Sequence, residues 1–149
     1  MIRNPSDSAE QRRMGTKLVS AFSSYSKVLL QQEKTLACGG SCTVEVDGYS
    51  ANPPILCEAW AHYGKIKGSN PYKVMTDALK LIFAEKYLGK KYRKILLFSN
   101  EDARKPFVGT SWKAQFLRDY GIETKVFPLS RRQSKEVTEA QKRQDRWQH

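Results

Sequence analysis

Residues 43–62 read TVEVDGYSANPPILCEAWAH, two strand-like segments on either side of a turn-forming Asn-Pro-Pro sequence. Side chains of a strand alternate between its two faces, so Glu45 and Asp47 share a face of the first segment. One face of the second segment holds alternate residues, namely Leu56, Glu58, Trp60 and His62. If the segments pair in one sheet, we expect Glu45, Asp47 and Glu58 to converge on one patch.

Carboxylates gathered on one patch need a counter-charge. They repel one another and lose hydration, so a stable fold seldom brings them together without a cation to neutralise them. The simplest such cation is a hard divalent metal ion held by oxygen ligands. The sequence therefore predicts a metal site at this patch.

The size and composition of the chain predict one domain around the patch. With 149 residues, 40% of them hydrophobic, the chain can bury roughly 70% of its unfolded surface. We expect an α/β domain over residues 1–129. The basic tail over residues 130–149 is expected to form either a surface helix or a disordered arm.

The location expected for the protein is the cytoplasm. The longest apolar runs are far shorter than the roughly 20 residues that cross a bilayer. The segment MIRNPSDSAEQRR has no apolar signal region. Three cysteines cannot all pair within the chain, and their spacing is a poor match to a zinc motif, so a reducing compartment is expected.

The net charge of the chain points to a polyanionic partner. Lysine and arginine number 26 against 15 acidic residues, which gives a net charge of +11. An excess of this size attracts polyanions, and nucleic acid is the leading candidate. Each phosphate contact would make binding weaken as salt rises. A membrane surface fits less well, because no segment reads as a basic amphipathic helix with an aromatic anchor face.

Helical periodicity is found in two long segments. From about Ser8 to Lys34, apolar residues recur at helical spacing. They are Met14, Leu18, Phe22, Tyr25 and Leu29. A second helix is expected from about Tyr72 to Leu88, capped by Asn70 and ended by Gly89. Its expected apolar stripe consists of Val74, Met75, Ala78, Leu79 and Ile82.

The remaining elements alternate between strand and helix. Residues 95–98 are wholly apolar, as expected of a strand covered on both faces. A third helix is expected over residues 110–120, with Trp112 in the core, and a last strand over residues 122–127. Such alternation predicts an α/β fold whose later strands are partly parallel.

A helix, an acid-bearing hairpin, a second helix and an apolar strand, in this order, resemble the core of the PD-(D/E)xK, or restriction-endonuclease-like, nuclease superfamily. The resemblance covers about Ser8 to Phe127. It implies a nuclease-like domain with a mixed central sheet of about four strands flanked by helices. Asp47 matches the first acid of the family motif and Glu58 the second. Trp60 stands where the motif has its lysine.

The family is known to relocate this lysine, which positions or activates the attacking water. The sequence offers Lys65 and Lys67 in a glycine-flanked loop and Lys73 at the start of the second helix. We favour Lys73, because a helix terminus holds a side chain in place while a loop moves. Lys65 and Lys67 are then expected to contact phosphates. On the same side of the helix as Lys73, at helical spacing, lie Asp77 and Lys80.

The resemblance implies phosphodiester hydrolysis with Mg²⁺ or Mn²⁺ as the cofactor. Asp47, Glu58 and the Ala59 carbonyl oxygen would hold the metal ion. Glu45 is either a second ligand or a solvent-facing acid. Glu33 matches the place where some family members supply a further acid, although a helix end would leave it exposed.

The face that carries Glu58 also carries two aromatic side chains. Trp60 either stacks on a base or belongs to the core, and the core is the commoner place for tryptophan. His62 either transfers a proton near neutral pH or lies at the surface. Together with Lys65 and Lys67, both are candidate contacts to nucleic acid.

Three functions remain open from the sequence. The first is a metal-dependent nuclease, acting on DNA more readily than on RNA and expected as a homodimer where it cuts a duplex. The second is a nuclease-like module that binds nucleic acid without cutting it, which the missing motif lysine favours. The third is a basic adaptor that binds a protein or an RNA through the tail over residues 131–146.

Overall fold

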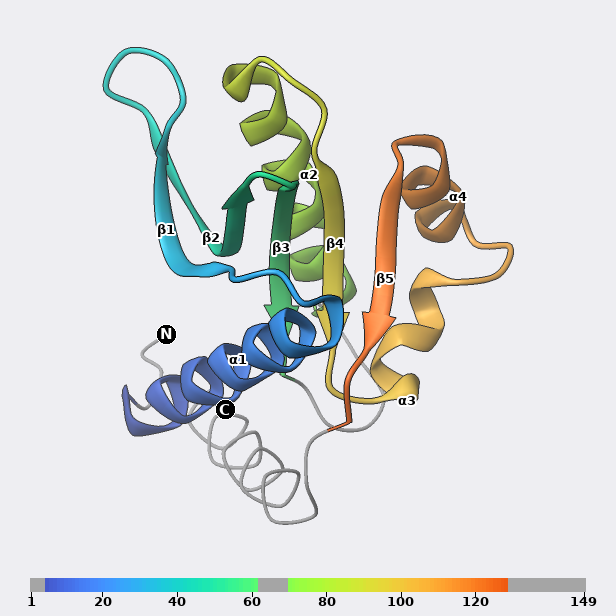
Figure 1. Cartoon of the computed structure of the whole chain (residues 1–149). Coiled ribbons are helices and arrows are strands. Elements are labelled where there is room, and N and C mark those ends of the chain that lie inside the picture. Colours follow the sequence, from blue (N-terminus) through green and yellow to red (C-terminus); the bar gives the residue numbers. More distant parts are fainter. Residues whose placement is uncertain (1–4, 62–69, 129–149) are drawn as a thin grey trace.

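The computed structural model describes residues 5–61 and 70–128 and forms one mixed sheet with helices on both sides (Figure 1). Its elements in chain order are α1 (Pro5–Ser26), β1 (Gln31–Ala37), β2 (Thr43–Ala51), β3 (Pro54–Trp60), α2 (Asn70–Leu88), β4 (Arg93–Phe98), α3 (Glu101–Arg104), the 3₁₀ helix η1 (Lys105–Phe107), α4 (Trp112–Asp119) and β5 (Ile122–Val126). The predictions for His62, Lys65, Lys67 and the tail over residues 130–149 lie outside the described residues.

The sheet has five strands in the order β1-β2-β3-β4-β5. β1, β2 and β3 are antiparallel neighbours, whereas β3, β4 and β5 run parallel. The α/β class and the mixed sheet flanked by helices are therefore confirmed. The expectation of about four strands is low by one, because a strand lies where the sequence predicted the end of a helix.

That strand is β1, and the first helix is shorter than predicted. α1 ends at Ser26, followed by Lys27 in the left-handed region with φ of 58°. Tyr25 and Leu29 continue the apolar periodicity of the helix, yet they are 71% and 91% exposed. The backbone of β1 pairs with β2 instead. Periodicity predicted burial here, but the strand pairing of a mostly polar segment determined the structure.

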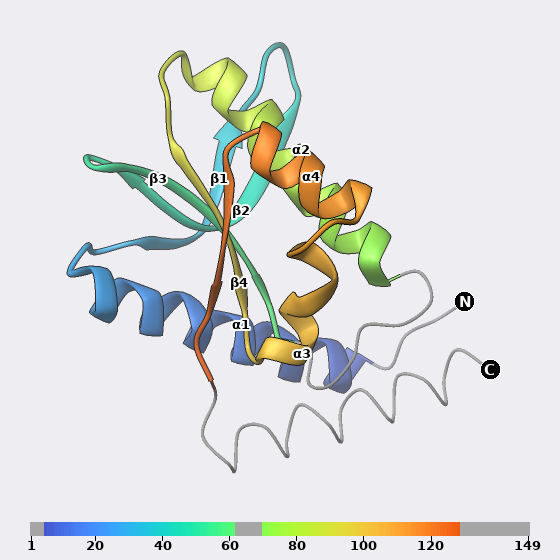
Figure 2. The ribbon, with the colours of Figure 1, turned by 90° about the vertical axis from the view of Figure 1, so that its right-hand side faces the viewer.

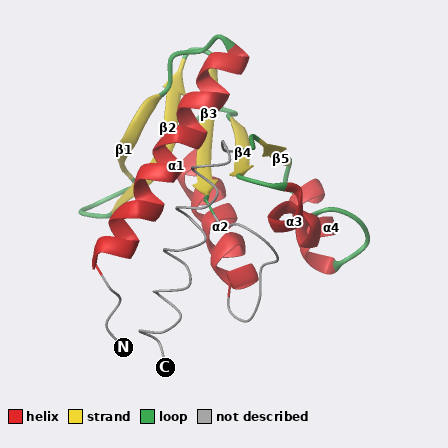
Figure 3. Cartoon of the chain, turned by 90° about the horizontal axis from the view of Figure 1, so that it is seen from below, coloured by secondary structure: helices red, strands yellow, loops and turns green. Residues whose placement is uncertain are grey.

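The helices form two layers, one on each face of the sheet (Figures 2 and 3). The α1-side cluster packs α1 against the sheet and includes Met14, Leu18, Val19, Phe22, Ile55, Cys57, Ile95 and Leu97. The α2-side cluster packs α2, α3, η1 and α4 against the other face and includes Val46, Leu56, Val74, Met75, Ala78, Leu81, Leu96, Phe98 and Leu117. β4 lies between the layers, so its wholly apolar segment is buried on both faces as predicted.

The second helix lies within two residues of its predicted bounds, and Gly89, with φ of 77°, follows its last residue. Of its predicted stripe, Val74, Met75 and Ala78 are buried and Ile82 is partly buried, whereas Leu79 is 54% exposed. Leu81 and Ala84, which were not predicted, are buried as well. Trp112, predicted to be in the core, begins α4 and is 63% exposed.

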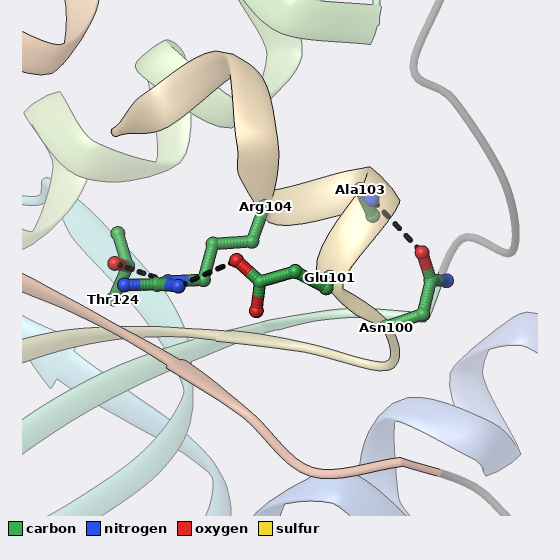
Figure 4. Close-up of polar contacts among 5 residues, drawn as sticks. All are labelled: Asn100, Glu101, Ala103, Arg104 and Thr124. Atoms are coloured by element: carbon green, nitrogen blue, oxygen red, sulfur yellow. Dashed lines mark hydrogen bonds and ion pairs between the residues drawn. The ribbon is translucent and has the colours of Figure 1, made fainter. Parts of the chain in front are cut away.

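The short helix α3 was not predicted, and polar contacts hold it in place (Figure 4). Asn100 caps the helix, since its Oδ1 accepts a hydrogen bond from the Ala103 N–H over 2.8 Å. Arg104 pairs with Glu101 within the helix and also donates through Nε to Thr124 Oγ1 over 2.9 Å. Thr124 belongs to β5, so this arginine connects α3 to the edge of the sheet.

Across residues 5–61 and 70–128, no helix combines the length and apolar character that a bilayer crossing requires.

Candidate active site

The candidate site forms where β2 and β3 separate. The two strands are paired from Ala51–Pro54 to Gly48–Cys57, and this ladder stops before Asp47. Beyond that point the Asp47 side chain, rather than the backbone of β2, pairs with β3. Its Oδ2 accepts a hydrogen bond from the Ala59 N–H over 2.8 Å. A carboxylate thus satisfies a strand donor that an ordinary ladder would pair with a backbone carbonyl.

The alternation of side chains in β2 is broken at Asp47. Val46 is fully buried in the α2-side cluster. A Cβ at Gly48, in contrast, would meet Cys57 Sγ and would lie 3.1 Å from Val19, both members of the α1-side cluster. Residues two apart in a regular strand share a face, so the strand turns over between Val46 and Gly48. Asp47 lies at this reversal.

The neighbouring strand has an irregularity at the same level. Glu33 in β1 stands opposite Asp47, between two regular cross-strand pairs, and its φ of 52° lies in the left-handed region. Non-glycine residues seldom adopt this conformation. Glu33 and Asp47 therefore lie opposite each other, at the level where the regular alternation of β1 and β2 is interrupted.

Glu58 is the second acid of the site and lies almost entirely out of solvent. It belongs to β3 and is 4% exposed. Its Oε1 lies 2.8 Å from Lys80 Nζ, so the buried carboxylate forms an ion pair with a lysine of α2. The Lys80 side chain itself is 29% exposed. The lysine therefore connects a buried acid with the solvent.

Electrostatic interactions join these residues and Asp77 into one carboxylate–lysine cluster of Asp47, Glu58, Asp77 and Lys80. Burial raises the pKa of Glu58 above its ordinary value, assisted by the charge of Asp47 and a hydrogen bond with it, whereas the adjacent Lys80 favours the ionised form. Burial also raises the pKa of Asp77 to about 6, against the effect of Lys80. Burial alone would lower the pKa of Lys80, but the three acids raise it above its ordinary value. The lysine therefore stays protonated at neutral pH.

The donor set of the site is small for a metal ion. In the part of the chain that the structure describes, no group of three or more His, Cys, Asp or Glu residues is placed to hold a metal. Asp47 and Glu58 supply two carboxylates, which is a sparse set. Mg²⁺ commonly binds through one or two carboxylates, keeps several waters and uses substrate phosphates for the rest. The residues present fit that mode of binding.

Cys57 separates the two acids in sequence but is no candidate ligand. Burial raises the pKa of its thiol, and the nearby charges of Asp47 and Glu58 raise it further. A metal-binding cysteine must lose its proton. A thiol in this position therefore stays protonated and packs as an apolar group in the α1-side cluster.

A pocket of about 220 Å³ lies between α1 and the strands, and Asp47 is one of its lining residues. Its lining residues are Arg12, Gly15, Thr16, Val19, Gln32, Glu33, Glu45, Asp47 and Ala59. The structure thus brings Glu45, Asp47 and Glu33 to one pocket beneath α1. Arg12 Nε lies 4.0 Å from Glu33 Oε1 at its mouth. Glu58 instead contacts Lys80 on the α2 side, so Asp47 stands between Glu45 and Glu58.

The other predicted site residues lie as follows. Trp60 is half-buried and packs against the α2-side cluster. Lys73 is in the first part of α2, two helical turns before the lysine that contacts Glu58. His62, Lys65 and Lys67 lie outside the described residues.

Lys80 and Asp77 are the site residues that sequence reasoning did not select. Their spacing from Lys73 on one side of the helix was a usable signal. The choice among the lysines, however, depends on which turn of α2 passes Glu58. That is a matter of how the helix packs on the sheet, and no local pattern reports it.

Comparison of the chain with protein-family models, with curated proteins and with solved structures finds no match.

Proposed function

We propose that this protein is a metal-dependent nuclease that hydrolyses phosphodiester bonds of nucleic acid, DNA more readily than RNA. The observation that carries the proposal is the 2.8 Å ion pair between Lys80 Nζ and Glu58 Oε1, beside Asp47 at the separation of β2 and β3. Two acids and one protonated amine meet there on adjacent elements of the sheet and α2.

The order of elements supports the proposal together with the motif spacing. A helix, an antiparallel hairpin that leads into parallel strands, and a helix after β3 match the arrangement that the PD-(D/E)xK resemblance implies. In that resemblance the motif lysine is replaced by Trp60. Lys80 is proposed as the substitute in preference to Lys73, because it contacts the second acid directly.

Asp47 and Glu58, with the Ala59 carbonyl oxygen, would hold Mg²⁺ or Mn²⁺. When bound, such an ion offsets the charge of the scissile phosphate and lowers the pKa of a water molecule. Asp47 has a further role in the chain itself, because its bond to the Ala59 N–H fixes the carboxylate against β3. Glu45 lines the pocket on the far side of Asp47 and is proposed to orient water there.

Lys80 is proposed to act through its positive charge. Because the surrounding acids raise its pKa, the amine remains protonated and cannot accept a proton at neutral pH. It would therefore donate hydrogen bonds to a phosphate oxygen or to the attacking water and stabilise the negative charge that develops. Glu58 and Asp77 hold that charge in place until the substrate arrives.

The decisive experiment measures cleavage of plasmid DNA, single-stranded DNA and single-stranded RNA by the wild type and Asp47→Asn. Each substrate is incubated with Mg²⁺, with Mn²⁺ and with EDTA. We expect metal-dependent cleavage by the wild type and by Lys86→Ala, a lysine at the other end of α2, and none by Asp47→Asn. Cleavage that persists in Asp47→Asn, or no cleavage by the wild type under any condition, would contradict the proposal.

One observation favours a second candidate, a nuclease-like module that binds nucleic acid without cutting it. Glu58 is 4% exposed and already paired with Lys80, as expected of a closed structural ion pair. This alternative predicts binding that weakens with salt, needs no metal and is unchanged in Asp47→Asn.

A further inference from the structure

Two exposed aromatic residues and a half-buried lysine on the α2 side form a group that the proposed chemistry does not use. Lys113 Nζ lies 4.9 Å from the ring centroid of Tyr72 and 4.7 Å from that of Trp112. Both rings are turned to solvent, at 61% and 63% exposure. We refer to Tyr72, Trp112 and Lys113 as the aromatic cradle.

The cradle joins two elements that are distant in sequence. Tyr72 lies in the first turn of α2 and Trp112 is the first residue of α4, and both helices cover the same face of the sheet (Figure 2). Two hydrogen bonds hold the start of α4 in place. Ser111 caps it by accepting the Ala114 N–H, and Arg118 Nη1 donates to the Gly109 carbonyl over 2.7 Å. The Trp112 ring is therefore presented from fixed backbone.

Among the residues that the structure describes, none neutralises the charge of the cradle. No acidic side chain in the described residues forms an ion pair with Lys113, whose Nζ lies over the two rings. Two exposed aromatic rings around an ammonium that pairs with none of the described acids suit a ligand that offers both a flat base and a phosphate. Single-stranded nucleic acid is recognised by this combination of stacking and positive charge.

The distance between the cradle and Lys80, the proposed catalytic lysine, is short enough for one nucleic-acid strand to contact both. Tyr72 precedes Lys80 by eight residues on the same helix, which corresponds to about 12 Å along the axis and about 80° around it. A strand whose phosphate lies at Lys80 can therefore place a neighbouring nucleotide at the cradle.

We infer that the aromatic cradle binds an unpaired nucleotide of the substrate strand, with the base stacked on Trp112 or Tyr72 and its phosphate on Lys113. This deepens the proposed nuclease function and rests on it for the nature of the substrate. The predicted preference is for single-stranded or unpaired DNA over a fully paired duplex, because paired bases do not present their faces for stacking.

The test measures the binding of fluorescein-labelled oligothymidylate of about 12 nucleotides, a length within known single-strand site sizes, by fluorescence anisotropy in EDTA. We expect Trp112→Ala and Tyr72→Ala each to weaken binding about 5- to 150-fold, the range that corresponds to the loss of one stacked base. Trp112→Phe keeps an aromatic face and should retain most of the affinity. Lys113→Gln should reduce the slope of log affinity against log salt by about 0.7.

Matched controls come from the far end of α2, where Lys86 Nζ lies 5.8 Å from the Tyr87 ring centroid. Tyr87→Ala and Lys86→Gln should leave binding within about twofold of the wild type, as expected of surface changes outside a site. Loss of affinity in these controls equal to that in the cradle variants would overturn the inference. So would unchanged oligothymidylate binding in both Trp112→Ala and Tyr72→Ala.

A second copy of the chain is the competing occupant, and sedimentation of the same variants distinguishes it. A wild-type dimer that Trp112→Ala dissociates, without any change in oligothymidylate affinity, would assign the rings to that interface and overturn the inference. Because binding is measured without metal, the result is independent of hydrolysis. If the cradle variants lose affinity and the wild type cuts no DNA, the nuclease proposal alone is contradicted. If the wild type cuts DNA and the cradle variants bind with unchanged affinity, the cradle inference is contradicted.

Discussion

Asp47 Oδ2 accepts a hydrogen bond from the Ala59 N–H over 2.8 Å, at the point where β2 leaves β3. One oxygen of this carboxylate thus takes the place of a strand carbonyl, and the other can serve a ligand. The same side chain lines a pocket beneath α1 and influences the pKa of Glu58. Its structural and chemical roles can be separated by choosing the substitution.

Asp47→Asn and Asp47→Ala should differ in stability but agree in activity. Asparagine retains a carbonyl oxygen for the Ala59 N–H, so we expect Asp47→Asn to be more stable than Asp47→Ala. Alanine leaves that donor unsatisfied, at a cost of about 1–3 kcal/mol. Urea unfolding measures both. Equal stability of the two variants would mean that the hydrogen bond is of no consequence to the fold.

Lys80→Met should lower the cleavage rate about 10²- to 10³-fold, as expected for the removal of one group that stabilises developing charge. Lys73→Met is the matched variant on the same helix and should retain a rate within about threefold of the wild type. Single-turnover cleavage compares them. The reverse result, with Lys73→Met inactive and Lys80→Met active, would return the catalytic role to the start of α2.

Mg²⁺ or Mn²⁺ should stabilise the folded protein even without substrate. An ion that binds only the folded state adds about 2.7 kcal/mol at a concentration of 100 times its Kd. We expect Tm to rise by several degrees in the wild type and not in Asp47→Asn. Glu58→Gln should also lose the response, since it removes the second carboxylate. A rise of equal size in all three proteins would place the ion elsewhere.

Gly48→Ala should destabilise the domain by about 1–3 kcal/mol, the usual cost of overpacking a filled interior. The added Cβ would meet Cys57 Sγ and would lie 3.1 Å from Val19. Gly40→Ala is a useful comparison, because a Cβ there meets nothing within 4 Å although φ is 55°. The double variant Gly48→Ala/Cys57→Ala should regain part of the lost free energy of unfolding, because it removes the sulfur that the added Cβ meets. Urea unfolding of both variants measures this.

Glu85 should make stability depend on acid pH. Its Oε2 accepts hydrogen bonds from the Tyr92 N–H and from Lys94 Nζ, over 2.9 and 2.8 Å. Burial acts to raise the pKa of Glu85, but the hydrogen bonds from Lys94 and Tyr92 outweigh it and hold the pKa below its ordinary value. Stabilisation is then present above the unfolded-state pKa of about 4.3 and is lost as pH falls through the folded-state pKa.

The matched variant is Glu85→Gln, which keeps an acceptor without the charge. We expect it to be about 1.5 kcal/mol less stable than the wild type at pH 7, the lower end of the range for hydrogen bonds to charged groups. The difference should shrink as pH falls below the unfolded-state pKa of about 4.3, and it should vanish once pH is below the lowered pKa of Glu85 in the folded protein. A difference that persists unchanged at low pH would show that the charge of Glu85 contributes nothing.

Local patterns predicted the elements with strong periodicity or wholly apolar sequence. α2, β4 and β5 were recognised because each buries a regular set of side chains, and their bounds differ from prediction by a few residues at most. β1 was missed because its residues QQEKTLA are mostly polar and its strand is set by pairing with β2. α3 was missed because its length is four residues and its cap and side-chain contacts define it.

By itself the sequence determined the class of the fold and the positive charge of the chain, and it singled out Asp47 and Glu58 as candidate site residues, because composition and alternation are local properties. Only the tertiary structure decided that Lys80 meets Glu58, that β2 turns over at Asp47 and that Trp112 faces solvent beside Lys113. Each of these depends on how a helix packs on the sheet or where two strands part. Those relations are set by contacts between residues distant along the chain, which no window of sequence contains.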